Sequence, residues 1–412
     1  MKTNLIQRKL SDGFLQFLTL FSSLLAVGVL TALFYYIFAN GLSLMNTDLL
    51  RNDYWSVSKI VAFDETVNQP GLYPRPQDLD ESVAWSEKWG IGFVDYLSHE
   101  KKQLVLIETV AADSPLQSAF DTSAGAAQGK PVALSAGLQV EKIDFSQAAG
   151  TADFTGMLAS ATATEVAQTL DQQAVKLTSI FIKTPGGGIR GSIITTAYLI
   201  LVSLLIALPI GIASAVYLSE MAKKNRINML IRTGIETLTG VPSIVYGLMG
   251  VSVLFPITAL MGAKTTNILL GALTMAIILL PTIIRSTEEA LLVVPKGLRD
   301  ASLSLGASQT QTIFKITLPC AMPGILSGIL LSIGRVVGES AALIYTMGTF
   351  INDKPGLLKQ GTSLAVHIWS VMSGEQPNFE LACAISIMIL IFVLILNIAV
   401  KFLTRRLQKS WH

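Results

Sequence analysis

The sequence predicts an all-α polytopic membrane protein that also carries a small domain of the α/β or α+β class. Hydrophobic residues make up 51% of the 412 residues and charged residues only 14%, whereas soluble domains contain about 25% charged residues. Six stretches are apolar over about 20 residues or more, the length that a helix needs to cross a bilayer. One long tract, residues 40–184, is mostly polar. Together these observations predict six transmembrane helices and one domain outside the membrane.

The six apolar stretches are interpreted as membrane helices in chain order. The first contains no charged residue and is longer than the apolar core of a secretory signal, so it is interpreted as a membrane helix over residues 14–39. The main transmembrane domain then covers residues 185–403. The predicted spans are Phe14 to Phe38, Ser192 to Leu218, Ile231 to Leu260, Thr266 to Ile284, Pro323 to Phe350 and Leu381 to Leu403.

The charges beside the spans predict how the chain is oriented. Short cytoplasmic segments retain Lys and Arg, and six crossings place the basic residues of the short segments on one side of the membrane. The N-terminal segment, residues 1–13, and the tail, residues 404–412, are therefore both predicted to be cytoplasmic. The basic residues on that side are Lys2, Arg8, Lys9, Lys223, Lys224, Arg226, Arg285, Lys296, Arg299, Lys315, Lys401, Arg405, Arg406 and Lys409.

The polar tract is predicted to be an extracytoplasmic domain. Gln103 to Val110 reads as a strand, and the tract is long enough for its own core. Between Asn46 and Lys183 there are 18 acidic and 10 basic residues, but long segments do not follow the charge rule. The domain is either a surface decoration or a docking surface for another extracytoplasmic component. The glycines at 186–188 are expected to form a flexible hinge into the second span.

Several kinds of site are not predicted. Both cysteines, Cys320 and Cys383, lie in or beside spans, where packing is the expected role. The three histidines, His99, His367 and His412, are scattered and do not have the spacing of metal ligands. No nucleotide-binding loop is recognised, so the chain is expected to bind no cofactor, to be no enzyme and to have no nucleic-acid partner.

The loop between the fourth and fifth predicted spans, residues 286–320, carries the most specific motif. Gly306 suits the left-handed turn that ends a helix, so two short helices are predicted, the second ending where the chain re-enters the bilayer. Such a helix-turn-helix can fit a groove on a soluble partner. The motif residues are Gly306, Ile316, Leu318 and Pro319, spaced G-x9-I-x-L-P, preceded by Asp300 and Ala301.

Two charges are predicted to lie inside the fifth span. Arg335 and Glu339 are four residues apart, so on a helix they share one face and can pair. If the span begins at Pro323, Arg335 lies roughly 18 Å inside it, close to mid-bilayer. A central Arg costs about 2.5–3.5 kcal/mol to insert and normally marks a pathway. The alternative is a buried ion pair that only joins helices.

The third predicted span carries a second charge pair and a break. Arg232 and Glu236, near the cytoplasmic boundary, are expected to act as a structural ion pair or a helix anchor rather than as a substrate contact. Helix breaks at membrane depth persist only where protein or water satisfies the freed backbone groups. Pro242, Ser243 and Gly247 are therefore candidates for a gate or cavity wall, with an ordinary proline kink as the alternative.

The chain resembles the phosphate-specific ABC importer permeases of the Pst type, most closely their A-type subunit. The resemblance covers about Pro185 to Leu403, and the extra domain after the first span is a departure from short family members. A second departure is Asp300, where the superfamily has Glu. The segments that carry the resemblance are PGGGIRGSI at Pro185, ALPIGIASAVYLSE at Ala207, GVPSIVYGLMG at Gly240, the loop at Arg299 to Pro319, and GRVVGESAALIYT at Gly334.

The resemblance implies a permease of the ABC type I importer fold in the bacterial inner membrane, passing inorganic phosphate inward by alternating access. Arg335 and Glu339 would lie on the path, and Glu339 would favour phosphate, which still carries a proton, over sulfate. The implied partners are a second, homologous permease, two ATPase subunits that use ATP and Mg²⁺, and an extracytoplasmic phosphate-binding protein. Two alternatives remain: a permease for sulfate or molybdate, and a membrane sensor with an extracytoplasmic ligand domain.

Overall fold

The computed structural model describes residues 2–64, 66, 68–97, 103–123, 128–184, 186–223, 225–374 and 377–409. The chain divides into two compact units. One is Leu50–Gly188, here called the inserted unit, and the other combines Met1–Leu49 with Ile189–His412, here called the membrane unit. The sequence predicts the inserted domain over residues 40–184. In the structure, residues 40–49 lie in the membrane unit.

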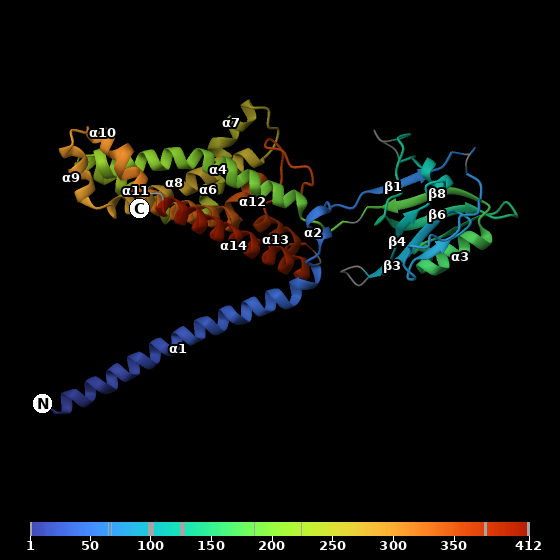
Figure 1. Ribbon diagram of the computed structural model, residues 1–412, viewed down its shortest axis with the longest axis horizontal. Coiled ribbons are helices and arrows are strands. Elements are labelled where there is room, and N and C mark those ends of the chain that lie inside the picture. The colour runs from blue at the N-terminus through green and yellow to red at the C-terminus, as the bar shows by residue number, and fades with distance from the viewer. Residues whose placement is uncertain are drawn as a thin grey trace. The chain divides into compact units, whose positions relative to one another are not determined.

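The inserted unit is an α+β domain built on one antiparallel sheet of eight strands (Figure 1). The strand order is β2-β3-β4-β6-β8-β1-β5, with β7 paired to β6. The predicted strand Gln103 to Val110 is confirmed as β4. The strands are β1 Ser58–Ala62, β2 Ala84–Ser86, β3 Ile91–Leu97, β4 Gln103–Val110, β5 Phe120–Asp121, β6 Gln139–Ser146, β7 Ala152–Thr155 and β8 Lys176–Lys183.

One helix, α3 (Ala163–Gln173), packs on this sheet. Its buried face includes Val166 and Leu170, which join the strands in one apolar core. A capping box starts the helix: the Glu165 carboxylate accepts the Thr162 backbone N–H at 2.8 Å, and Thr162 Oγ1 accepts the Glu165 N–H at 3.3 Å. The hydrogen bonds that the carboxylate accepts from the Thr162 backbone N–H and from Thr162 Oγ1 lower the pKa of Glu165.

Gly186 and Gly188 approach the backbone of residues 52–56 closely, whereas the space around Gly187 is open, with φ +84°. The flexible hinge expected at 186–188 stays a prediction. The Gly187 N–H donates to Tyr54 O at 2.9 Å and the Gly188 N–H to Asp53 O at 3.2 Å. A Cβ on Gly188 would lie 1.9 Å from the Asn52 carbonyl oxygen. Glycine is therefore needed for close backbone approach where the two connecting segments meet.

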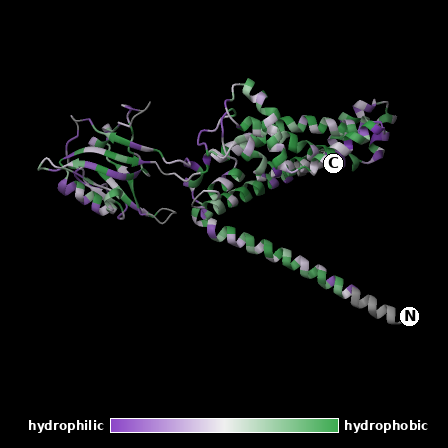
Figure 2. Ribbon diagram, turned by 180° about the vertical axis from the view of Figure 1, so that it is seen from behind, coloured by the Kyte–Doolittle hydropathy of each residue, from purple (hydrophilic) through white to green (hydrophobic). Residues whose placement is uncertain are grey.

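The membrane unit contains six helical segments long and apolar enough to cross a membrane, which confirms that number (Figure 2). These apolar segments are Asp12–Leu44, Arg190–Met221, Ser243–Leu260, Ile268–Leu292, Gln309–Gly338 and Phe379–Phe402. The helices that form the unit are α1 Lys2–Gly41, α2 Thr47–Arg51, α4 Arg190–Val216, α5 Arg226–Thr239, α6 Ser243–Met249, α7 Phe255–Leu260, α8 Ile268–Leu292, α9 Lys296–Ser304, α10 Gln309–Thr312, α11 Leu318–Gly338, α12 Ala341–Met347, α13 Leu364–Met372 and α14 Phe379–Lys409, with π-helical turns η4 Tyr217–Met221, η5 Gly250–Leu254 and η6 Ile313–Thr317.

Helix α8 is the centre of the membrane unit, with most of its side chains buried. Small residues let its neighbours approach closely. A Cβ on Gly211 of α4 would meet Ile283 at 2.6 Å, and one on Gly328 of α11 would meet Ser286 at 2.1 Å. Glycine at such positions allows the close helix contacts that are typical of membrane bundles.

The break that the sequence predicts in the third span, Ile231 to Leu260, is present at Pro242. Helix α5 ends at Thr239, and α6 begins at Ser243. Pro242 between them is extended, with ψ 138°. Proline has no N–H to continue a helix, so the apolar crossing segment is only Ser243–Leu260.

The fifth span also differs from the prediction of Pro323 to Phe350. One continuous helical segment runs from Gln309 to Gly338, through Pro319 and Pro323. Since α8 also extends to Leu292, the loop is shorter than the predicted 286–320 at both ends. Proline is tolerated here because it lies near the start of α11, beside the wide π turn η6.

The two ends of the membrane unit differ in what they carry. At the start of α4, the Ile189 N–H donates to Leu49 O at 2.8 Å, so both connections to the inserted unit leave from this end. At the other end of α4, η4 contacts the loop that contains α9. Within the membrane unit, the residues at which the chain leaves for and returns from the inserted unit, Leu49 and Ile189, therefore lie at the opposite end of α4 from the α9 loop.

Candidate functional site

Arg335 and Glu339 do not form the predicted ion pair. Arg335 lies in the last turn of α11, and Glu339 has already left the helix, with ψ 128°. The Glu339 carboxylate instead accepts the Ala342 N–H at 3.2 Å, which stabilises the first turn of α12. The reason for the difference is local: the i, i+4 rule holds only while the helix continues.

Arg335 nevertheless lies near the middle of the bundle. Helices α8 and α11 are antiparallel, since Gly324 approaches Ala290 and Gly328 approaches Ser286. Arg335 is seven residues beyond Gly328, so it lies roughly 10 Å further along α11, at about the level of Leu279. Leu279 is near the centre of α8, and it shares a core cluster with Val336.

The broken third span lies beside Arg335. Tyr246, a buried residue of α6, shares a core cluster with Val336, the residue next to Arg335. Tyr246 donates to Leu238 O at 2.8 Å, across the break. This hydrogen bond satisfies one of the carbonyls that the interruption frees. The sequence analysis did not single out Tyr246, although its position in GVPSIVYG, directly after the break, was an available signal.

Pro242, Ser243 and Gly247 have different positions. Pro242 is exposed and Ser243 half-buried, whereas Gly247 is buried. A Cβ on Gly247 would lie 2.9 Å from Ala342 O, so α6 and α12 are in backbone contact there. Helix α6, which follows the break in the third span, and helix α12, which follows the end of α11, are therefore in contact near Arg335.

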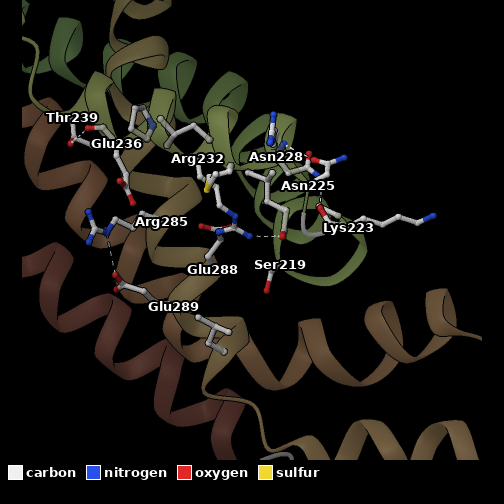
Figure 3. A pocket seen from close by; sticks show the side chains of 17 residues that line it. Ser219, Lys223, Asn225, Asn228, Arg232, Glu236, Thr239, Arg285, Glu288 and Glu289 are labelled. Carbon is white, nitrogen blue, oxygen red and sulfur yellow. Dashed lines mark hydrogen bonds and ion pairs between the residues drawn. The ribbon is translucent and has the colours of Figure 1, made fainter.

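A cavity of about 840 Å³ lies between η4, α5 and α8, toward the α9 end of the bundle (Figure 3). Arg232 does not pair with Glu236 as predicted. Its guanidinium contacts Glu288 of α8 at 2.8 Å and donates to Leu218 O. The sequence could not show this contact, because α5 and α8 are separated by the broken span. Arg285 and Glu289, also on the cavity wall, are 3.4 Å apart and exposed.

The predicted turn at Gly306 is confirmed. Its φ is +85°, the Gly306 N–H donates to Leu303 O at 2.9 Å, and the Ala307 N–H donates to Ser302 O at 3.2 Å. This pair of hydrogen bonds is the Schellman motif that ends a helix. Space around Gly306 is open, so the left-handed backbone rather than packing favours glycine.

The loop residues separate into a surface set and a packed set. Asp300, Ala301 and Gly306 are exposed, as is Leu305, at 90%. Leu318, by contrast, packs on a core cluster that contains Val216, Leu291 and Ile313. The half-buried residues of the motif are Ile316, Leu318 and Pro319.

Among the described residues, no group of His, Cys, Asp and Glu side chains could hold a metal ion. His367 is buried, and its Nδ1 lies 2.8 Å from Ser192 Oγ. Other residues named from the sequence, His99, Pro185, Lys224 and His412, lie outside the described residues.

Comparison with known proteins identifies the family of the membrane unit. Residues 207–411 match the family of binding-protein-dependent transport system inner membrane components. The probable ABC transporter permease protein YqgI of Bacillus subtilis is 36% identical over 240 residues, 55% of this chain and 80% of that relative. The chain belongs to the ABC transporter permease family.

Other permeases in this family carry a substrate in their names. The phosphate transport system permease protein PstA of Pasteurella multocida is 34% identical over 231 residues, 55% of this chain and 80% of the relative. Among solved structures, the MetNI methionine ABC transporter in inward-facing conformations covers 53% of this chain and 95% of its own, at 22% identity and a TM-score of 0.43. The inserted unit lies outside the residues that match the family model.

Proposed function

We propose that this permease is a subunit of an ATP-driven importer of inorganic phosphate of the ABC type I class. The substrate path runs past Arg335 and is completed by a second, homologous permease. Similarity to relatives named as phosphate permeases in Pasteurella multocida and Yersinia pestis supports the choice of substrate. The structural observation that supports the proposal is that Arg335 is exposed and has no ion-pair partner among the described residues.

Arg335 is an exposed guanidinium at mid-depth of the helix bundle. Among the described residues it has no ion-pair partner within 4.0 Å. A charge at this depth costs about 2.5–3.5 kcal/mol to insert, and such residues normally face a wet cavity or a partner. A guanidinium can bind two oxygens of a phosphate in a forked geometry. An oxyanion that passes Arg335 would therefore supply the missing counter-charge.

Glu339 gives this site a preference among oxyanions. Its carboxylate is held beside the path by the Ala342 N–H, one turn of chain after Arg335. A phosphate that still carries a proton can donate a hydrogen bond to it, whereas fully ionised sulfate only repels it. In this proposal Arg335 attracts the oxyanion, and Glu339 discriminates between phosphate and sulfate.

The surface of the α9 loop suits the remaining partners. Asp300, Ala301 and Gly306 lie on the exposed side, with apolar Leu303 and Leu305 beside them. A mixed apolar and charged helix of this kind can dock on a soluble protein, here the ATPase pair that uses ATP and Mg²⁺. The connections to the inserted unit leave from the opposite end, where an extracytoplasmic phosphate-binding protein would deliver its cargo. In this proposal both chain termini lie in the cytoplasm.

The test is uptake of labelled phosphate by membrane vesicles that contain the whole transporter, with sulfate and molybdate as competitors. We expect excess sulfate to leave phosphate uptake unchanged in the wild type. Glu339→Gln removes the repulsion, so sulfate should then compete. Equal uptake of sulfate and phosphate by the wild type would identify a different oxyanion permease. Co-purification of a kinase or regulator in place of an ATPase would identify a sensor.

A further inference from the structure

Helix α9, which carries Asp300 and Ala301, is weakly packed on the rest of the permease. None of its residues is buried. Apolar packing normally supplies most of the stability of a short helix in a protein. The attachment of α9 must therefore depend on a few polar contacts, and these can be identified.

The strongest contact is an ion pair between Arg299 of α9 and Glu220 of the π turn η4. Arg299 Nη2 lies 2.9 Å from Glu220 Oε1, and Nη1 donates to Oε2 at 3.2 Å. The side chains are 24% and 9% exposed, respectively. The Nη1–Oε2 hydrogen bond and the short Nη2–Oε1 ion-pair distance hold the guanidinium against the carboxylate. Burial protects the pair from screening by salt.

Two further hydrogen bonds converge on the same place. Arg299 Nη2 also donates to Leu291 O, in the last turn of α8, at 2.7 Å. Gln309, the first residue of α10, donates from Nε2 to the backbone oxygen of Glu220 at 3.0 Å. One ion pair therefore joins α9, η4 and α8, and Gln309 attaches the start of the fifth span to the same turn.

The turn that receives these contacts is itself unusual. Glu220 lies in η4, a π-helical continuation of α4. Such π turns have weaker geometry than an α-helix and occur often at functional positions. A second π turn, η6, follows α10 within the loop. The connection between the loop and the spans is thus made of segments that can change their helical pitch.

We propose that the Arg299–Glu220 pair is a positioning pair that transmits movement of α9 to α4 and α8. The inference rests on the proposed docking of α9 on an ATPase. When the ATPase moves α9, the fork of Arg299 pulls η4 and the end of α8 along with it. Without the pair, α9 can still bind the ATPase through its exposed side, but its motion is lost before it reaches the spans.

A purely structural role for the pair makes a different prediction. Loss of a structural contact lowers the amount of folded transporter and leaves the uptake per ATP of each remaining transporter unchanged. Loss of a transmitting contact leaves assembly in place and uncouples ATP hydrolysis from transport. The ratio of ATP hydrolysed to substrate moved therefore separates the two roles.

The experiment compares Glu220→Gln, Arg299→Gln and Arg299→Lys in the complete transporter, reconstituted in liposomes with its binding protein. We expect both Gln variants to retain the ATPase subunits and basal hydrolysis. Phosphate uptake per ATP should fall about tenfold, which corresponds to about 1.4 kcal/mol of coupling. Arg299→Lys keeps the charge and should lose less. Glu289→Gln, which removes an exposed ion-pair partner on α8, is the matched control and should behave as wild type.

Unchanged uptake per ATP in both Gln variants would overturn the proposal, as would a loss of uptake that merely follows the amount of assembled transporter. Failure of the underlying function has a different signature, because the wild type itself would then bring down no ATPase. A wild type that hydrolyses ATP but moves no phosphate would refute the cargo alone. In that case the distance between labels on α9 and α4, measured with and without ATP, still tests the pair.

Discussion

Three arginines of the membrane unit, Arg232, Arg299 and Arg335, differ in whether another element supplies a carboxylate partner. Arg299 and Arg232, at the α9 end, each contact a carboxylate on another element, Glu220 and Glu288, and each also donates to a backbone oxygen. Arg335, at mid-depth, has no carboxylate partner within 4.0 Å among the described residues.

This contrast indicates how the permease divides its charges. Where elements must stay together, each cation is neutralised by the protein, which offsets the cost of removing it from water. On the proposed substrate path, the charge of Arg335 is left available for an anion. Four predictions test this division, in order of decreasing effect.

The largest effect is expected for Arg335→Gln. Loss of a charged hydrogen-bonding group to phosphate costs about 3 kcal/mol, equivalent to about a 100-fold loss of uptake. The complex should still assemble, because among the described residues Arg335 has no ion-pair partner whose loss would weaken the fold. Uptake of labelled phosphate, divided by the amount of complex, is the measurement. Arg335→Lys keeps a positive charge but not the two-pronged guanidinium, so its uptake should lie between those of the wild type and Arg335→Gln. If Arg335→Gln takes up phosphate at the wild-type rate, Arg335 is not on the path.

Arg232→Gln is expected to lower the stability of the complex and to leave uptake unchanged, the opposite of Arg335→Gln. It leaves Glu288, with 17% of its side chain exposed, without its partner. Breaking a partly buried charged contact costs about 1–3 kcal/mol, so the thermal unfolding temperature of the purified complex should fall. Uptake per folded complex should be unchanged. If uptake per complex falls as far as in Arg335→Gln, the division between the two groups of arginines is wrong, and the 840 Å³ cavity beside Arg232 belongs to the path.

Gly306→Leu tests the α9 end without changing a charge. A β-carbon at φ +85° costs about 1–2 kcal/mol, so the turn after α9 is distorted and binding of the ATPase should weaken by about tenfold. Co-purification of the ATPase measures this. Gly306→Asn is the control, because Asn tolerates the left-handed conformation, and it should retain the ATPase. Equal retention by both variants would contradict the docking role.

The smallest effect is expected for Arg285→Gln, since Arg285 and Glu289 are both more than 60% exposed. Exposed pairs contribute about 0–1 kcal/mol. The unfolding temperature should therefore change little. Arg285 lines the same cavity as Arg232, so the two variants together compare an exposed ion pair with a partly buried one at the same place. A large fall in uptake at unchanged stability would show that this cavity conducts the anion.

Much of the architecture follows from local sequence. The number of membrane helices depends only on apolar runs long enough to cross a bilayer, and Gln103 to Val110 forms a strand because its apolar residues suit a half-buried sheet. Gly306 was recognised because only a residue without a side chain readily takes a positive φ at the end of a helix. Each of these features depends on residues that are neighbours in the chain.

The tertiary structure decided which charges meet. Arg232 pairs with Glu288 and Arg299 with Glu220, across 56 and 79 positions of the chain. The spacing of Arg335 and Glu339 predicted a pair, but the helix ends between them. Apolar length and glycine conformation are properties of a segment, whereas an ion pair is a property of packed elements. The sequence by itself therefore determined that this chain is a membrane permease. Only the packing determined that Arg232 and Arg299 pair with carboxylates of other elements, whereas Arg335 has no carboxylate within 4.0 Å among the described residues.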